Sequence, residues 1–243
     1  MRAGRPFVEI VVNRMPRLLV GLALGLIASM PGVARAANDF SAAEQALFMD
    51  SPLAKLRPPL TLRYGYRKTG TLEEAFDDTV DVMLSAQADG SCCAAHAQFF
   101  RGARAVRQPD VESAQGNPAI LYFLERDIRE MERLTKGKAN YFRKRIRMAV
   151  YQAASIRELT LPYRGALVPV REISIAPYLD DPNRPRYEKL ANKRYLFLLS
   201  QAVPGGLYAI RTRIDGEAGA TAPLLAEEML LDGADTAPLR RQP

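Results

Sequence analysis

Hydrophobic and polar residues alternate along three stretches in the first half of the chain. In residues 60–67 every second residue is apolar or aromatic, a period of two that is typical of a half-buried strand. Residues 79–86 repeat this pattern, and residues 92–101 follow a hairpin-turn signal at Asp89 and Gly90. These patterns predict three neighbouring strands.

The hydrophobic period then lengthens to that of a helix. Asn117 is a favourable N-cap and Pro118 suits the first helical position, so we expect a helix from there to about residue 136, stopped by Gly137. A second helix is expected directly afterwards, over about residues 138–154. The two segments predict a helical hairpin.

Strand patterns return after the helices. Residues 156–163 and 166–178 flank a turn signal at Arg164 and Gly165, and Pro169 places part of the second strand at an edge or a bulge. The next pair has a stronger turn signal.

Pro204 and Gly205 suit a type II turn, because proline has the φ of the first central residue and glycine tolerates the positive φ of the second. Residues 195–201 should therefore pair with residues 207–214. Residues 224–231 predict a last strand or a short helix.

Strands, a helical hairpin and further strands together predict an α+β fold. We expect one domain over residues 37–231, in which a curved antiparallel sheet is covered on one face by the helical hairpin of about residues 118–154. Residues 232–243 are expected to form a flexible tail. No family's motifs match the chain well enough to name one, and the expected architecture is analogous only at fold level to periplasmic lipid or lipoprotein carriers.

The segment before this domain has the pattern of a secretory signal peptide. A positive charge at Arg17 precedes 13 apolar residues at 18–30, and a small-x-small cleavage site lies at residues 34–36. Thirteen helical residues rise about 20 Å, less than the roughly 30 Å of a bilayer core, which favours a cleaved leader over a retained anchor. We expect residues 1–36 to be removed, with Met15 as an alternative start, leaving a periplasmic protein without an integral membrane segment.

Removal of the leader changes the charge of the protein. The chain has a formal net charge of +7, and the leader contains five arginines and one glutamate, so the mature protein keeps only +3. Because the positive excess is small and the leader directs the chain out of the cytoplasm, no nucleic-acid partner is expected.

Cysteine and histidine are too scarce for most metal and nucleophilic sites. Cys92 and Cys93 are adjacent, and neighbouring α-carbons lie about 3.8 Å apart, below the usual 4.4 to 6.8 Å of a disulfide. We expect two unbridged residues, with a vicinal or intermolecular disulfide as the alternative in an oxidising compartment. His96 is the single histidine and lies in a strand pattern. No metal, cofactor or catalytic residue is therefore assigned.

One charged residue falls on the apolar side of the first helix. Asp127 projects onto this arc, so it is the candidate for a buried charge, expected to pair with an arginine from the neighbouring helix or sheet. The alternative is an active-site acid, with Asp127 and Glu125 as the first candidates in a carboxylate-based periplasmic enzyme. The arc consists of Leu121, Leu124, Ile128, Met131 and Thr135.

The second helix has a basic face opposite its apolar one. The apolar face gathers Phe142, Ile146, Ala149, Val150 and Ala153. The opposite face carries Asn140, Arg143, Lys144, Arg147 and Tyr151. A solvated face is the simpler interpretation, and the alternative is a binding strip for lipid headgroups, lipopolysaccharide phosphates or an acidic partner.

These patterns predict an exported, non-enzymatic binding or accessory protein. It is expected to hold a lipid or other apolar ligand, or to dock a cell-envelope protein partner. The alternatives are the carboxylate-based enzyme and a structural component of an envelope or secretion assembly.

Overall fold

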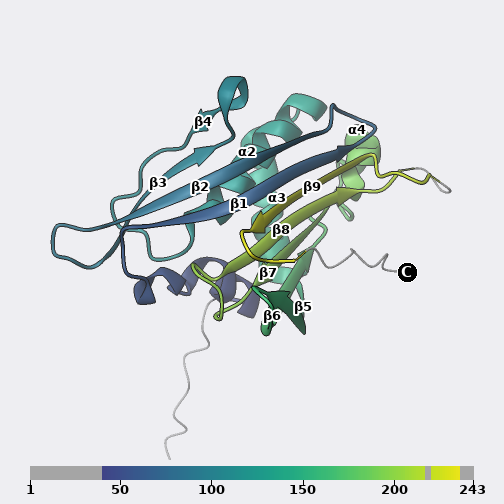
Figure 1. Ribbon diagram of the computed structural model, residues 1–243. Helices are drawn as coiled ribbons and strands as arrows, with labels where there is room; N and C mark the ends of the chain where they lie inside the picture. Colours follow the sequence, from purple (N-terminus) through teal and green to yellow (C-terminus); the bar gives the residue numbers. More distant parts are fainter. Residues whose placement is uncertain (1–39, 217–219, 236–243) are drawn as a thin grey trace, which may run out of the picture. The chain divides into compact units, whose positions relative to one another are not determined.

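The computed structural model describes residues 40–216 and 220–235 (Figure 1). Its centre is a nine-stranded sheet in the order β4-β3-β2-β1-β9-β8-β7-β6-β5, with every neighbouring pair antiparallel. The α+β class and the large antiparallel sheet are confirmed, and the sheet is open. The strands are β1 (Leu60–Gly70), β2 (Phe76–Ala86), β3 (Cys92–Phe99), β4 (Val106–Arg107), β5 (Ser155–Tyr163), β6 (Ala166–Ile175), β7 (Arg194–Leu199), β8 (Leu207–Ile214) and β9 (Leu225–Leu231).

The last strand lies in the middle of the sheet. Met229 of β9 is opposite Tyr66 of β1 on one side and Ile210 of β8 on the other. The sequence left a strand and a short helix open for this segment, and the structure selects the strand. Because β9 pairs on both sides, it joins the strands before the helices to those after them.

Two long helices form the predicted hairpin, α2 (Pro118–Thr135) and α3 (Ala139–Gln152). The Asn117 side chain accepts a hydrogen bond from a first-turn N–H of α2, as its N-cap position predicted. The helix ends at Thr135, and its C-cap residue Lys136 has a φ of 57°, so the left-handed residue comes one position before the predicted stop at Gly137.

The buried face of α2 differs from the predicted arc. Leu121 is 58% exposed, whereas Glu130 is buried. Glu130 is buried because Lys68 of β1 lies on this side of the helix and forms an ion pair with its carboxylate. On α3, Phe142, Ile146, Ala149 and Val150 are buried as expected, and Ala153 is exposed.

Several short helical segments were not predicted. Ser41 and Glu44 form a capping box at the start of the first, and Leu47 and Leu53 are buried in the core. These are α1 (Ala42–Glu44), η1 (Gln45–Met49), η2 (Pro52–Lys55), η3 (Gly102–Arg104), α4 (Arg184–Tyr187) and η4 (Glu188–Asn192). Across the described ranges, no helix is both long and apolar enough to span a membrane.

The structure joins Cys92 and Cys93 as a vicinal disulfide, which is the alternative and not the expected unbridged pair. The expected signal peptide over residues 1–36 lies outside the described residues. So do residues 236–243 of the expected tail. The first part of that tail is bonded to the sheet, since the Arg164 N–H donates to the Gly233 carbonyl at 2.8 Å.

Candidate functional site

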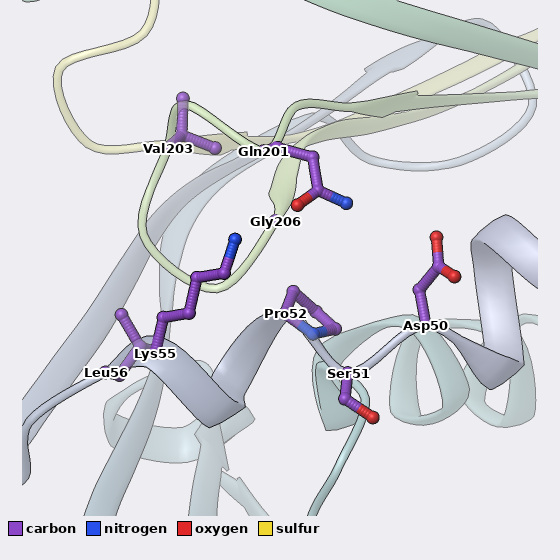
Figure 2. Close-up of a pocket in the computed structure, with 8 residues that line it drawn as sticks. All are labelled: Asp50, Ser51, Pro52, Lys55, Leu56, Gln201, Val203 and Gly206. Atoms are coloured by element: carbon purple, nitrogen blue, oxygen red, sulfur yellow. The ribbon is translucent and has the colours of Figure 1, made fainter.

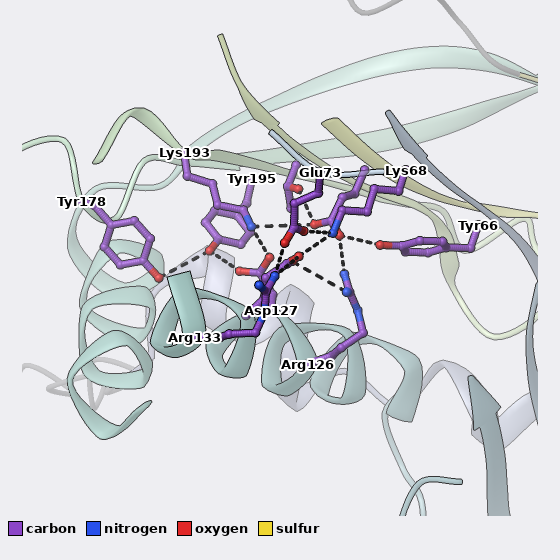
Figure 3. A network of polar contacts seen from close by, with 12 residues as sticks. Tyr66, Lys68, Glu73, Arg126, Asp127, Arg133, Tyr178, Lys193 and Tyr195 are labelled. Carbon is purple, nitrogen blue, oxygen red and sulfur yellow. Dashed lines mark hydrogen bonds and ion pairs between the residues drawn. The ribbon is translucent and has the colours of Figure 1, made fainter. Parts of the chain in front are cut away.

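Asp127, the candidate buried charge, lies in a polar network between α2 and the sheet (Figure 3). Its carboxylate is fully buried. One oxygen accepts a hydrogen bond from the Tyr195 hydroxyl at 2.5 Å, and the other accepts one from the Lys193 ammonium. The ion-pair partner is therefore a lysine immediately before β7, not the expected arginine.

The network continues from Lys193 to a second buried carboxylate, Glu227 on β9. Arg126 Nη2 lies 2.7 Å from Glu227 Oε1, and the Tyr66 hydroxyl donates to the same oxygen at 2.5 Å. The Thr212 hydroxyl donates to Oε2 at 3.0 Å. Burial alone would raise the pKa of Glu227, but the charges of Arg126 and Lys193 outweigh burial and hold it well below its usual range.

Lys68 on β1 connects two further carboxylates at the other end of the network. Its ammonium lies 2.5 Å from Glu130 Oε1 and also contacts Glu73, which in turn contacts Arg133. Burial, followed by the negative charge of Glu227, raises the pKa of Glu130 to about 7. Burial also opposes ionisation of Glu73, but hydrogen bonds with Glu130, Lys68 and Arg133 lower the pKa of Glu73 to about 2. The Arg133 side chain is 57% exposed, so the network reaches the surface here.

The network is balanced in charge and links α2 to β1, β9 and the start of β7. Oxygens of Asp127, Glu130 and Glu227 lie within 4.8 Å of one another, a spacing that a metal ion can use. Basic side chains already neutralise this cluster, because Lys193 contacts Asp127 and Arg126 contacts Glu227. The residues present therefore favour a structural ion-pair network over a metal centre.

The structure does not bring Asp127 and Glu125 together as a catalytic pair. Asp127 is enclosed against the sheet, whereas Glu125 lies on another side of α2 and bonds to Arg143 of α3, with 2.7 Å between Nη2 and Oε1. One carboxylate has no contact with solvent and the other belongs to an interhelical ion pair. This arrangement offers no shared space for a substrate between them.

The predicted binding strip lies on the exposed face of α3. Its five residues, Asn140, Arg143, Lys144, Arg147 and Tyr151, are all exposed. Arg143 is held by Glu125 and also contacts the Asn140 side chain. Lys144 and Arg147 make no ion pair within the described part of the chain.

A groove lies where the N-terminal segment meets the start of α2 and the β7–β8 turn. It consists of two adjoining cavities of about 190 and 170 Å³. Figure 2 shows the first cavity, with the side chains of Lys55, Asp50 and Gln201 directed into it. The lining of the second combines apolar and polar side chains. The apolar ones are Ala46, Leu47, Pro52, Ile120, Pro169 and Leu199, and the polar ones include Glu158, Arg171 and Ser200.

The walls of this groove are held by close contacts at the β7–β8 turn. Asn117 Nδ2 donates to the Tyr64 hydroxyl at 2.7 Å and to the Gly205 carbonyl at 3.0 Å. Gly206 has a φ of 73°, and a Cβ there would lie 2.6 Å from Pro52 Cβ. Only glycine allows this approach. The groove is therefore built on fixed backbone.

Sequence reasoning missed Lys193, Glu227 and the groove. Glu227 did carry a signal, because the alternation of the strand places it on the same buried face as the apolar residues Leu225 and Met229. Lys193 carried a weaker signal, because it lies just before the predicted strand and alternates with Tyr195 and Phe197. The groove is assembled from segments far apart in the sequence, so no local pattern predicts it.

No protein-family model matches the chain, and no curated protein matches it. Among solved structures, it is similar to the lipoprotein LppX of Mycobacterium tuberculosis, with a TM-score of 0.32, 9% identity, and coverage of 82% of this chain and 96% of that one. A LolA superfamily protein from Nitrosomonas europaea gives a TM-score of 0.21, 10% identity, and coverage of 81% and 94%. At these TM-scores the likenesses carry no argument about function.

Proposed function

We propose that the protein is an exported, non-enzymatic binding or accessory protein that docks on an anionic surface of the cell envelope through α3. The observation that carries this proposal is the pair of cations, Lys144 and Arg147, on the exposed face of that helix without an ion pair in the described residues. The proposal places the mature protein in the periplasm after removal of residues 1–36.

The charges of α3 support an anionic partner. The helix contains four basic residues and no acidic one. Arg143 is neutralised by Glu125, and Arg145 by Asp181, with 3.0 Å between Arg145 Nε and Asp181 Oδ2. Lys144 and Arg147 remain, and they face the same side as Tyr151, a residue that is 53% exposed. Two cations beside an amphipathic aromatic ring suit lipid headgroups at a membrane surface.

The groove favours a second binding role, for a lipid or other apolar ligand. Leu47 and Ile120 supply buried apolar walls, and an ion pair between Arg171 and Glu158, 2.9 Å apart, lies at its border. The proposal includes the hairpin of α2 and α3 as the cover of one face of the sheet, supported by the ion pairs from Asp127 to Lys193 and from Arg126 to Glu227.

Vesicle co-sedimentation tests the docking role. The mature chain, starting at Ala37, is mixed with phosphatidylcholine vesicles that contain or lack phosphatidylglycerol. We expect binding only to the anionic vesicles, weakening as salt rises because screening acts on exposed charges. The variant Lys144→Glu/Arg147→Glu should lose this binding.

The matched control is Arg57→Glu/Arg194→Glu, which changes the net charge equally at two exposed positions outside α3. It should retain most of the binding. Equal losses in both double variants would show that only net charge matters, and an absence of binding by the wild-type protein would refute docking on anionic lipid.

A further inference from the structure

We infer that the groove binds a small zwitterion with an apolar side group, a molecule in which an ammonium and an acid group lie a few bonds apart. This inference rests on the groove being a binding site, as proposed above, and specifies its ligand. Two sources share this chemistry: a free apolar α-amino acid, and a single-chain lipid whose head joins an amine to a phosphate.

The first cavity, called the polar cavity from here on, is lined by one side chain of each charge, Lys55 and Asp50. Figure 2 shows the Lys55 ammonium and the Asp50 carboxylate directed into the same space from separate positions on its wall. Asp50 Oδ1 accepts a hydrogen bond from Gln45 Nε2 at 3.2 Å, which leaves its charge without a cation. Neither Lys55 nor Asp50 forms an ion pair within the described residues. A ligand that places its acid group at Lys55 and its ammonium at Asp50 complements both charges.

A neutral polar group lies between these charges. The Gln201 amide is directed into the same cavity and can both donate and accept hydrogen bonds. It therefore suits either end of a zwitterion. Single-charge ligands, by contrast, would leave Lys55 or Asp50 without a partner.

The adjoining cavity takes the apolar group. It shares Asp50, Pro52, Gln201 and Gly206 with the polar cavity, so one molecule can extend from one to the other. Leu47 and Ile120 are buried in its wall. Removing a leucine-sized group from water there favours binding.

The volumes limit the size of the ligand. The cavities measure about 190 and 170 Å³, each below the roughly 300 to 1,000 Å³ of pockets for drug-sized molecules. A two-chain lipid is too large. An amino acid, or the head and first carbons of a single-chain lipid, matches this size.

Calorimetric titration of the mature chain tests the inference with L-leucine and, separately, with a lysophosphatidylethanolamine below its micelle concentration. We expect at least one of them to bind. Leucine binding identifies a free amino acid as the source, and binding of the lysolipid alone identifies the lipid head. Binding of neither overturns the inference.

Two truncated analogues of leucine test which charged residue binds which group of the ligand. The carboxylate 4-methylpentanoate lacks the amine of leucine, and 3-methylbutylamine lacks its acid group. Lys55→Gln should weaken leucine and the carboxylate about two- to fivefold and leave the amine unchanged. Asp50→Asn should weaken leucine and the amine and leave the carboxylate unchanged. Equal effects on both analogues would overturn the assignment.

The matched control for Lys55→Gln is Arg57→Gln, an exposed cation two residues away that does not line either cavity. It should not change the affinity for leucine. An uncharged apolar dye, Nile red, separates the two proposals for the groove. Dye binding without leucine or lysolipid binding would refute the zwitterion and keep an apolar site, while vesicle binding through α3 is scored independently.

Discussion

Lys193 and Asp127 form an ion pair in which both side chains are buried from solvent. The lysine precedes β7 and the aspartate lies in the middle of α2, so this contact crosses from the sheet to the helix. Tyr195 donates to the second oxygen of Asp127. Both charges can be buried because each has a partner of opposite sign. Removing one of them leaves the other charge buried without that partner, which destabilises the folded protein.

Replacing Asp127 should therefore destabilise the protein strongly. We expect Asp127→Asn to lower the free energy of unfolding by about 3 to 5 kcal/mol, because the buried Lys193 charge loses its close partner and keeps only Glu227, whose Oε2 lies 3.7 Å away. Urea unfolding measures this loss. The control Asp77→Asn breaks an exposed pair with Arg67 and should cost about 1 kcal/mol or less. If Asp127→Asn costs no more than the control, the buried pair is not a structural contact.

Glu130 should make stability fall as the pH rises through the weakly acidic range. Its pKa is raised from about 4.5 to about 7 in the folded protein, so between these values the folded state holds a proton that the unfolded state has released. Stability then decreases with rising pH across this window. Glu73, with its pKa lowered to about 2, acts in the opposite sense below about pH 4.5.

The variant Glu130→Gln isolates this effect, because its amide resembles the protonated acid and cannot ionise. Urea midpoints between pH 5 and 8 should decrease for the wild-type protein and stay nearly level for the variant. Glu132→Gln, an exposed change on the same helix, should leave the decrease in place. A wild-type midpoint that rises steadily across this range would contradict the prediction.

Asn117 should contribute more than an ordinary helix cap. Its carbonyl oxygen caps α2, and its amide binds the Tyr64 hydroxyl and the Gly205 carbonyl. We expect Asn117→Ala to cost about 2 to 4 kcal/mol, combining a lost cap with buried polar groups left unpaired. Asn117→Ser retains the cap and should cost less. Thermal unfolding of both variants measures the difference. A serine variant as stable as the wild type would show that only the cap matters, and equal losses would show that the cap contributes little.

Alanine substitutions at two glycines should distinguish the energetic effect of a positive φ from that of a steric clash. Gly205 has a φ of 71°, and a Cβ there would lie 2.5 Å from Leu62 Cδ1. Gly165 has a φ of 80° with no atom within 4 Å of the same position. Gly165→Ala should cost about 1 kcal/mol from the positive φ alone, and Gly205→Ala about 1 to 3 kcal/mol more from the clash. Chemical denaturation measures both, and equal losses would contradict the contact at Gly205.

The elements with strong local patterns were predictable. The alternation over residues 60–67, the cap at Asn117 and the turn at Pro204 and Gly205 each depend on neighbouring residues, and the structure has a strand, a helix start and a turn at these places. The short segments η1 and η2 carried no periodic pattern. Their conformation follows from Leu47 and Leu53 packing on a core that forms from other parts of the chain.

The sequence by itself determined the α+β class, the position of the helical hairpin and the inward direction of Asp127, because hydrophobic period and capping act over a few residues. Only the tertiary structure decided that β9 lies between β1 and β8, that Lys193 neutralises Asp127, and that distant segments enclose a groove. These relationships depend on which residues meet across the sheet. Pairing of that kind is set by the packing of the whole core, and no local pattern specifies it.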